Sequence, residues 1–397
     1  MDVQGRPQVD GYLVAAGHDD LVVDGGTQPL RMGLIGTGRF GQFCLEQYLT
    51  VPQVEVVAVA DTVPSRAAEV AEAHGLVAVP PEELLALADV DLIYLGTPPS
   101  THAGLSVRAL EAGRHVICEK PLALDVASGR RAVEAAGRAG RFLVVNLIMR
   151  YDPICIAVQT IMERRLLGEP LHASFENYAK DEDLPSGHWF WDRSQSGGIF
   201  IEHGVHFFDL FSMWFGPGRI TSAQQLRRPG TNLVDQVACT AEYGGGVHAA
   251  FYHGFHQAAR MDRQEIRIVC ERGDIRLAEW MPTSLTIDCL AGNPTLEQLL
   301  AVVPNADSRC IASYSGPERL VTSRHRRYEV DGRFVVSGDL GAGKMSIYAQ
   351  AVRALLVDQV TALRHAGHPR LVTEANALAS LELAAAADQL ARHDGNG

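Results

Sequence analysis

The chain has 397 residues and a formal net charge of −12. This length exceeds what one hydrophobic core usually supports, so we expect two domains. Acidic residues are spread along the chain and no Lys/Arg block stands out, which argues against nucleic acid and an anionic membrane surface as partners. A composition of 47% hydrophobic and 21% charged residues is typical of a folded globular protein rather than a disordered one.

The ends and the cysteines indicate the compartment. The seven cysteines are scattered with no CxxC pair, a pattern typical of free thiols in a reducing environment. The sequence shows no signal pattern at its start and no apolar run of the about 18 residues that a membrane span needs. We therefore expect a cytoplasmic protein. Residues 1–30 are predicted to be an N-terminal extension with a short strand at Gly11–Ala15.

Short apolar strands alternate with helices over residues 31–150. Pro64 opens one helix at the first-turn position that proline favours, and Gly75 ends it. The predicted strands are 31–36, 54–61, 91–96, 114–121 and 141–146, and the predicted helices are 39–50, 64–75, 100–113 and 126–140. This alternation predicts an α/β domain with a doubly wound parallel sheet, of the Rossmann type.

The pattern changes over residues 151–397. A predicted helix at Pro153–Leu167 precedes a series of strand-like stretches, and two helices close the chain. The predicted strands lie within 170–179, 235–255, 263–278, 284–290 and 327–336, and the closing helices are Ala342–Ala366 and Glu374–His393. These elements predict a second, α+β domain with a large and mostly antiparallel open sheet.

A glycine motif follows the first predicted strand and opens a helix. It reads Gly36-x-Gly38-x-x-Gly41, and Asp61 ends the next strand 20 residues later (61 − 41). In this context the glycines allow a tight turn, close approach of a pyrophosphate and packing of helix on strand, while the acid accepts the ribose hydroxyls. An acid repels a 2′-phosphate, and no Arg immediately follows Asp61, since Arg66 lies five residues on in the helix. NAD is therefore expected, and NADP remains possible.

Residues 197–209 place polar groups among large apolar ones, where charges are costly to bury unless paired. If 199–213 is a helix, Glu202 and His206 share a face, and Asp209 follows three residues later. A carboxylate then orients His206, which exchanges a proton with the substrate hydroxyl. His203 points about 100° away from Glu202.

Two other interpretations of this stretch remain open. Glu202, His203 and His206 could hold a metal, although their order fits neither HExxH nor HxxEH. A buried histidine–acid pair could also be purely structural. Lys120 favours catalysis, because it ends a strand at the carboxyl edge of the first sheet, where ligands of such sheets bind.

Several motifs together resemble the Gfo/Idh/MocA oxidoreductases, the family of glucose–fructose oxidoreductase and inositol dehydrogenase. They are the glycine motif, GTPPSTH (96–102), CEKP (118–121), and Gly-Gly followed by an acid, Gly and His (197–206). The resemblance covers about residues 31–397. It implies that Lys120, His206 and Glu202 are catalytic, although most members carry Asp in place of Glu202. It also implies a homodimer or homotetramer joined through the open sheet, whose exposed apolar face would need cover.

We expect the cofactor to contact the glycine loop and neighbouring strand ends. These candidate residues are Gly36, Thr37, Gly38, Arg39, Phe40, Gly41, Asp61, Thr97, Pro98, His102, Glu119 and Lys120. The substrate-binding candidates lie in the second domain or at its start. They are Arg150, Tyr178, Trp189, Trp191, Asp192 and His203.

The sequence therefore predicts an NAD-dependent oxidoreductase that interconverts a secondary alcohol and a ketone on a sugar, amino sugar or cyclitol. Lys120 and His206 are expected to handle the proton. One alternative is a regulatory protein that binds the cofactor without catalysis, because a fold does not fix a function. Another is a glycosidase or self-recycling sugar oxidase of the same fold, in which NAD is reduced only transiently.

Overall fold

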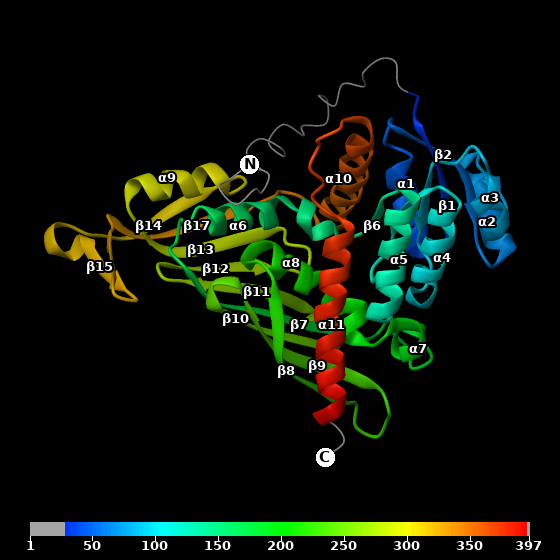
Figure 1. Cartoon of the computed structure of the whole chain (residues 1–397). Coiled ribbons are helices and arrows are strands. Elements are labelled where there is room, and N and C mark those ends of the chain that lie inside the picture. The colour runs from blue at the N-terminus through cyan, green and yellow to red at the C-terminus, as the bar shows by residue number, and fades with distance from the viewer. Residues whose placement is uncertain (1–27, 395–397) are drawn as a thin grey trace.

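Two sheets form the framework of residues 28–394, the part of the chain that this computed structural model describes. Figure 1 shows the smaller sheet with its helices on one side of the molecule, the larger sheet on the other, and helix α11 (Glu374–Asp394) running between them. None of the helices in this part combines the length and the apolar character that a membrane span needs. The strand predicted at Gly11–Ala15 lies outside the described residues.

The first sheet is parallel and has the strand order β3-β2-β1-β4-β5-β6, which confirms the predicted doubly wound fold. Its strands are β1 (Leu30–Ile35), β2 (Val54–Ala60), β3 (Val77–Ala78), β4 (Leu92–Leu95), β5 (His115–Cys118) and β6 (Leu143–Val145). Its helices are α1 (Arg39–Tyr48), α2 (Pro64–His74), α3 (Pro81–Ala86), α4 (Pro99–Glu111) and α5 (Val126–Ala139). The chain order reverses between β1 and β4, so a crevice opens at the carboxyl ends of these two strands.

The second sheet has nine strands in the order β14-β17-β13-β12-β11-β7-β10-β9-β8. It is antiparallel except where β10 pairs with β7, which confirms a mostly antiparallel sheet. Its strands are β7 (Pro170–Lys180), β8 (Gly218–Arg227), β9 (Val234–Tyr243), β10 (Val247–Gln257), β11 (Arg263–Cys270), β12 (Gly273–Ala278), β13 (Ser284–Ala291), β14 (Asp307–Ser313) and β17 (Gly332–Asp339).

Helices cover one face of the second sheet. The Phe207 ring of α8 stacks on Phe175 of β7 with ring centroids 3.5 Å apart, and Phe208 packs edge-on against Phe251 of β10. The helices of this domain are α6 (Pro153–Glu163), α7 (Arg193–Ser196), the π-helical turn η3 (Phe200–Gly204), α8 (Val205–Phe215), α9 (Asn293–Val302) and α10 (Lys344–Arg364). Alternate residues of strands such as β7, β9 and β11 therefore bury apolar side chains on this face.

The outer face of the second sheet is polar. Ion pairs join Arg267 to Asp274 and Arg333 to Asp288 across neighbouring strands. The exposed apolar sheet face that we expected is therefore wrong for this chain, since alternation places charged residues there.

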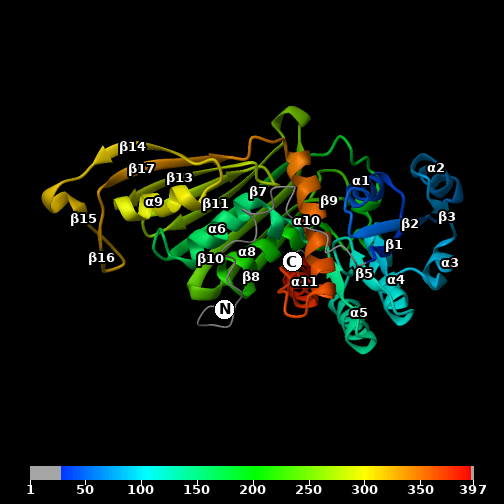
Figure 2. The same cartoon turned by 90° about the horizontal axis from the view of Figure 1, so that it is seen from above.

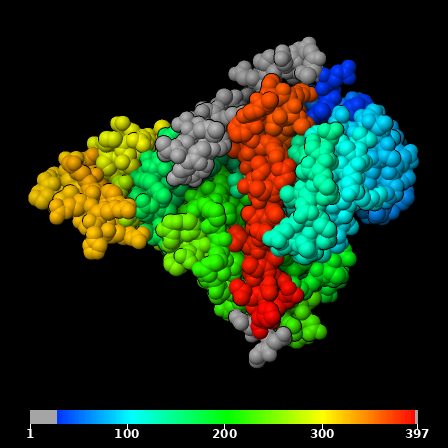
Figure 3. All heavy atoms as spheres, viewed as in Figure 1, coloured from blue at the N-terminus to red at the C-terminus, as the bar shows by residue number. Residues whose placement is uncertain are grey.

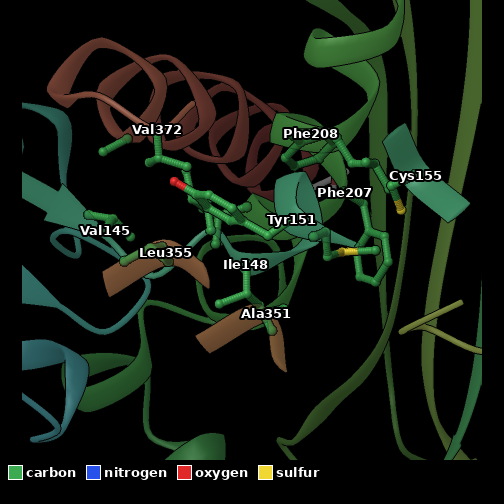
Figure 4. Close-up of a cluster of buried hydrophobic side chains, with 14 of the residues drawn as sticks. Val145, Ile148, Tyr151, Cys155, Phe207, Phe208, Ala351, Leu355 and Val372 are labelled. Atoms are coloured by element: carbon green, nitrogen blue, oxygen red, sulfur yellow. The ribbon is translucent and has the colours of Figure 1, made fainter. Parts of the chain in front are cut away.

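A short connection joins the two domains and shares a core with α10. The chain leaves β6 through the 3₁₀ turn Ile148–Tyr151 and enters α6. Figure 4 shows Tyr151 among Val145, Leu355 and Val372. The Tyr151 hydroxyl donates to Asp358 at 2.6 Å, so the crossover is fixed to α10.

A narrow arm extends the far end of the second sheet. It consists of the two-stranded pair β15 (Leu320–Ser323) and β16 (Arg326–Glu329). Figure 2 and Figure 3 show this arm and α9 reaching away from the rest of the molecule.

Candidate active site

The glycine loop forms a cradle that only glycine can build. Gly36 has φ +102°, and a Cβ there would lie 2.5 Å from the Gly96 carbonyl oxygen, while a Cβ on Gly41 would clash with the Gly36 carbonyl. A Cβ on Gly38 would meet nothing within 4 Å. Helix α1 begins after Gly38 without a side-chain cap, so its first N–H groups face this open space. The cradle therefore fits the pyrophosphate of a dinucleotide.

Asp61 lies at the edge of the cradle and is nearly buried. Its carboxylate accepts hydrogen bonds from the Thr37 N–H (2.9 Å) and hydroxyl (3.0 Å) and from the Val63 N–H (2.9 Å), with Arg66 at 3.3 Å. Burial alone would raise the pKa of Asp61, but these donors lower it below the usual value. An ionised Asp61 suits ribose binding, and a ribose hydroxyl must share or displace the Thr37 hydroxyl or Arg66. We name Gly36, Gly38, Gly41 and Asp61 the cofactor cradle.

Two of the other predicted cofactor residues face inward. His102 is fully buried, and its two ring nitrogens lie 2.6 Å from the Pro121 carbonyl oxygen and 2.7 Å from the Thr97 carbonyl oxygen, so its one N–H can donate to either of them. His102 therefore braces two loops of the crevice, whereas we had expected it to contact the cofactor. Pro98 is the N-cap of α4, so the predicted residues Thr97 and Pro98 lie on the loop that His102 holds.

Glu119 also points into the core of the first domain. Its carboxyl group accepts hydrogen bonds from the Tyr94 hydroxyl (2.9 Å) and the Asn146 amide (2.6 Å). Burial raises the pKa of Glu119 to about 7, and these two donors oppose the rise only in part. Glu119, which we expected to contact the cofactor, thus belongs to a buried hydrogen-bond network, next to Lys120 in the chain.

Lys120 joins the two domains at the carboxyl edge of the first sheet. Its ammonium group donates to the Glu202 carboxylate at 2.5 Å and to the Glu202 carbonyl oxygen at 2.8 Å. Our expectation that Glu202 orients His206 is therefore corrected. Helical spacing shows which side chains can meet, but a cation from another domain is a stronger partner for a carboxylate than a neutral imidazole.

His206 lies beside this ion pair and is buried. Burial, and next the charge of Lys120, hold its pKa well below the usual value, so the imidazole is neutral. Its Nδ1 has no hydrogen-bond partner among residues 28–394. Asp209, the other acid expected to orient it, instead binds Arg150 through two bonds of 2.7 and 2.8 Å. We name Lys120, Glu202 and His206 the proton-handling cluster, after the role that the sequence predicts for Lys120 and His206.

The stretch expected to be one helix is a π-helical turn followed by α8. Gly198, with φ +93°, precedes the turn, and a Cβ there would lie 2.6 Å from the Arg193 guanidinium. Arg193 in turn contacts both carboxylate oxygens of Asp388 at 2.7 Å, which fixes the turn to α11. A π turn at this place agrees with the frequent use of such turns at functional sites.

The predicted substrate residues are not all brought to this cluster. Arg150 forms an ion pair with Asp209, and Tyr178 packs against Tyr252, with tilted rings, on the outer face of the sheet, opposite α8. Asp192 caps α7 through the Ser194 N–H. Arg150 and Asp192 thus already have protein partners and Tyr178 lies on the other face of the sheet, and substrate contact by these three residues stays a prediction.

The two tryptophans of the aromatic loop at 188–193 have different surroundings. Trp189 is among the exposed apolar residues, whereas the Trp191 indole donates to the Leu184 carbonyl oxygen and packs against Phe255. His203 is half-buried, and its Nδ1 lies 2.9 Å from Nδ1 of His253 on β10. Of the predicted substrate residues, His203 is the one that shares surroundings with Lys120 and His206.

Sequence reasoning missed an aromatic row that closes the other side of the cluster. The half-buried Trp280 ring lies 6.5 Å from His206 and 5.3 Å from Tyr348 of α10. Tyr348 in turn lies 5.7 Å from Phe40, which begins the cofactor helix α1. No local signal marks Trp280, because it sits in the turn between β12 and β13 and long-range folding alone brings it to His206.

The metal interpretation has no support in the described residues. Within residues 28–394 no group of three or more His, Cys, Asp or Glu side chains is arranged to hold a metal ion. The Glu202 carboxylate that such a site would need is bound to Lys120.

The cofactor cradle and the proton-handling cluster together define a dinucleotide-binding oxidoreductase class of protein. The NAD-binding Rossmann-fold model of the Gfo/Idh/MocA oxidoreductase family matches residues 30–147, and the model of the family's C-terminal domain matches residues 156–276. The chain belongs to the Gfo/Idh/MocA family. The predictions of family, of an NAD-binding Rossmann domain and of the dehydrogenase class are thereby confirmed.

Individual relatives agree with this assignment. The chain is 27% identical to scyllo-inositol 2-dehydrogenase (NAD(+)) of Bacillus subtilis over 229 residues, which is 55% of this chain and 65% of the relative. It is 30% identical to trans-1,2-dihydrobenzene-1,2-diol dehydrogenase of Oryctolagus cuniculus over 251 residues, 61% of this chain and 73% of the relative. The alignments thus span roughly half to three quarters of the curated relatives.

A solved structure extends the likeness of the fold to nearly the whole chain. Levoglucosan dehydrogenase in complex with NADH and L-sorbose superposes with a TM-score of 0.72 at 18% identity, covering 93% of this chain and 98% of that one. At this identity the match supports the fold of both domains and not the substrate.

Proposed function

We propose that the protein is an NAD-dependent dehydrogenase that interconverts a secondary alcohol and a ketone on a sugar, amino sugar or cyclitol. The observation that carries this proposal is the position of Lys120. It lies two residues after the end of β5, next to the cofactor crevice, and its ammonium group is held by Glu202 of the second domain beside a neutral His206. A cation and a neutral base at the edge of a nicotinamide site suit the removal of a hydroxyl proton.

The three residues divide the work. Bound NAD supplies the hydride acceptor. Lys120 donates a hydrogen bond to the substrate oxygen and stabilises the negative charge that grows there as its proton leaves. His206 accepts that proton, because burial and Lys120 keep the imidazole neutral before substrate binds. Glu202 is a positioning residue that holds the Lys120 ammonium in place through its side chain and its carbonyl oxygen.

The extra methylene of Glu202, compared with Asp, is compatible with these roles. The longer side chain reaches the Lys120 ammonium while the carbonyl oxygen of the same residue contacts it at 2.8 Å. Lys120 is thereby fixed at two points on one residue, so that its remaining N–H can face the substrate.

The aromatic row favours a cyclic substrate. Trp280 offers a half-buried ring face close to His206, and the C–H face of a sugar or cyclitol packs well on such a ring. The relatives named above act, by their names, on an inositol and on a cyclic diol, which supports the same class of substrate here.

The proposal is tested by following NADH at 340 nm with purified protein, NAD and a panel of inositols, monosaccharides, amino sugars and anhydrosugars. We expect NADH to accumulate with at least one member. A product that forms without net NADH, unless a carbonyl acceptor is added, would favour the self-recycling oxidase or glycosidase. Tight NAD binding with no product from any member would favour the regulatory protein.

The assembly and the compartment remain predictions. A homodimer or homotetramer is still expected, but contact through the second sheet would have to use its polar outer face, where Tyr178 packs against Tyr252 and Arg263 lies 4.5 Å above Tyr178. Light scattering at micromolar concentration tests the assembly, and a monomer would refute it. Cytoplasmic localisation likewise stays a prediction.

A further inference from the structure

Two histidines from different elements meet at the base of the proposed substrate site. His203 belongs to the π-helical turn and His253 to β10, and their Nδ1 atoms lie 2.9 Å apart. A hydrogen bond between two Nδ1 atoms requires one to carry a hydrogen and the other to be bare. The pair therefore fixes opposite tautomers for the two rings.

Both rings are neutral. Burial lowers the pKa of His253 to about 3. Burial also lowers the pKa of His203, and the nearby His253, Lys120 and His206 lower it further. Neither imidazole is therefore charged at neutral pH, and the pair acts through hydrogen bonds.

His253 makes no other polar contact. It is fully buried with its ring among Phe175, Phe200 and Phe207, and its Nε2 has no partner in the part of the chain that the structure describes. Orphaned donors are rarer than orphaned acceptors inside proteins, so we infer that this Nε2 is bare. His253 then donates from Nδ1 to His203, and His203 carries its hydrogen on Nε2.

His203 differs from its partner in being half-buried. Its ring packs against Phe207 and Phe255, 5.2 and 5.3 Å away, and it lies close enough to Lys120 to be affected by its charge. With Nδ1 bound to His253, the Nε2–H is the polar group of His203 that remains for a ligand.

We propose that the His203–His253 pair recognises a second substrate oxygen and so selects the vicinal hydroxyl that sugars and cyclitols carry. His203 donates from Nε2 to the oxygen on the carbon next to the one that Lys120 and His206 serve, and His253 is a positioning residue that fixes the ring and tautomer of His203. This inference rests on the proposed function and adds the substrate feature that the site selects.

The test compares trans-1,2-cyclohexanediol with cyclohexanol as substrates at saturating NAD. The wild-type protein is expected to prefer the diol in kcat/KM by at least about 10²-fold, because a site built for a hydroxyl rejects an analogue that lacks it. His253→Leu removes the donor to His203 and is expected to lower this preference about tenfold. The loss should appear in KM with kcat little changed, since the second oxygen does not react.

Matched variants separate positioning from packing. In His253→Asn the amide nitrogen occupies the place of Nδ1, so the preference for the diol should be retained. His248→Leu, an exposed position on the same strand, is the control and should behave as wild type. If His253→Leu does not fold, His203→Leu takes its place and should lose the preference in the same way.

The outcomes are distinct. Equal kcat/KM for diol and monoalcohol, an unchanged preference in the leucine variants, or turnover of the sugar panel without the diol would overturn the inference and leave the proposed dehydrogenase standing. Absence of NADH with every alcohol would overturn the proposed function, and this inference with it.

Discussion

The cofactor cradle and the proton-handling cluster lie at the same crevice but are made of different parts of the protein. The cradle combines the glycine-loop backbone of one strand–helix unit with the Asp61 carboxylate that follows β2, and the shape of the loop depends on Gly36 and Gly41 having no Cβ. The cluster is made of side chains that the fold brings together from two domains, since Lys120 and Glu202 are 82 positions apart. Changes in the cradle should therefore act through steric fit, and changes in the cluster through charge.

The largest effect is expected in the cluster. Lys120→Met and His206→Ala should each lower kcat by about 10²–10⁴-fold, the usual contribution of groups that handle a proton. NAD affinity should stay close to wild type, because the cradle is untouched. Steady-state kinetics and fluorescence titration with NAD measure the two quantities. A loss of NAD affinity that accounts for the whole effect would place these residues in the cradle instead.

Two glycine substitutions in the cradle should separate stability from binding. Gly41→Ala should lower the free energy of unfolding by about 3 kcal/mol or more, since its Cβ would overlap the Gly36 carbonyl. Gly38→Ala should fold as wild type, because its Cβ meets nothing within 4 Å, but should weaken NAD binding by about tenfold or more where the pyrophosphate approaches. Thermal melts and NAD titrations check both. Equal effects of the two variants on stability would refute the steric account.

A smaller effect concerns Glu119 behind the cluster. Its folded-state pKa of about 7 exceeds the unfolded value of 4.5, so the folded protein binds the extra proton. The contribution of Glu119 to the free energy of unfolding is therefore fully present below pH 4.5 and is lost as the pH rises through about 7. Glu119→Gln keeps the acceptor for Tyr94 and Asn146 and removes this loss, so above pH 7 it should be more stable than wild type by up to about 3 kcal/mol. Urea unfolding at pH 5 and pH 8 measures the stability of both proteins. If Glu119 were solvated, Glu119→Gln would not be more stable than wild type at pH 8.

The smallest effect is expected at the rim of the cradle. Arg66 is half-exposed and 3.3 Å from Asp61, so Arg66→Ala should change stability by less than about 1 kcal/mol. Without this cation Asp61 should repel a 2′-phosphate more strongly, and NADP should bind a few-fold more weakly while NAD binds as before. Calorimetric titration with both cofactors provides the comparison. Tighter NADP binding by the variant would contradict this role of Arg66.

The sequence predicted the fold well because its signals are local. Strands such as β4 and β5 are continuous apolar runs bounded by turn residues, and the spacing from Gly41 to Asp61 reflects a single strand–helix–strand unit. Elements with weak local signals were missed. The two-residue strand β3 and the short helix α3 have few residues to show a period, and β8 lies outside the predicted strands.

The site was predicted less completely, because its contacts are long-range. Lys120 and His206 were identified from motifs, but the partner of Glu202 was not. Helical spacing predicts only neighbours on the same helix, and the fold brings Lys120 to Glu202 from another domain. Trp280 lies in a turn without any motif and meets His206 only through the packing of β12 and β13. The proton-handling roles remain a proposal for the experiments above.

The most direct test of the account measures Glu202→Gln in the Lys120→Met background. If Glu202 acts only by holding the Lys120 ammonium, the double variant should have the kcat/KM of Lys120→Met alone, within about twofold. In the wild-type background the same change should lower kcat/KM clearly. A further drop in the double variant, as large as the one in wild type, would show that Glu202 serves His206 directly and would contradict the assignment made from the structure.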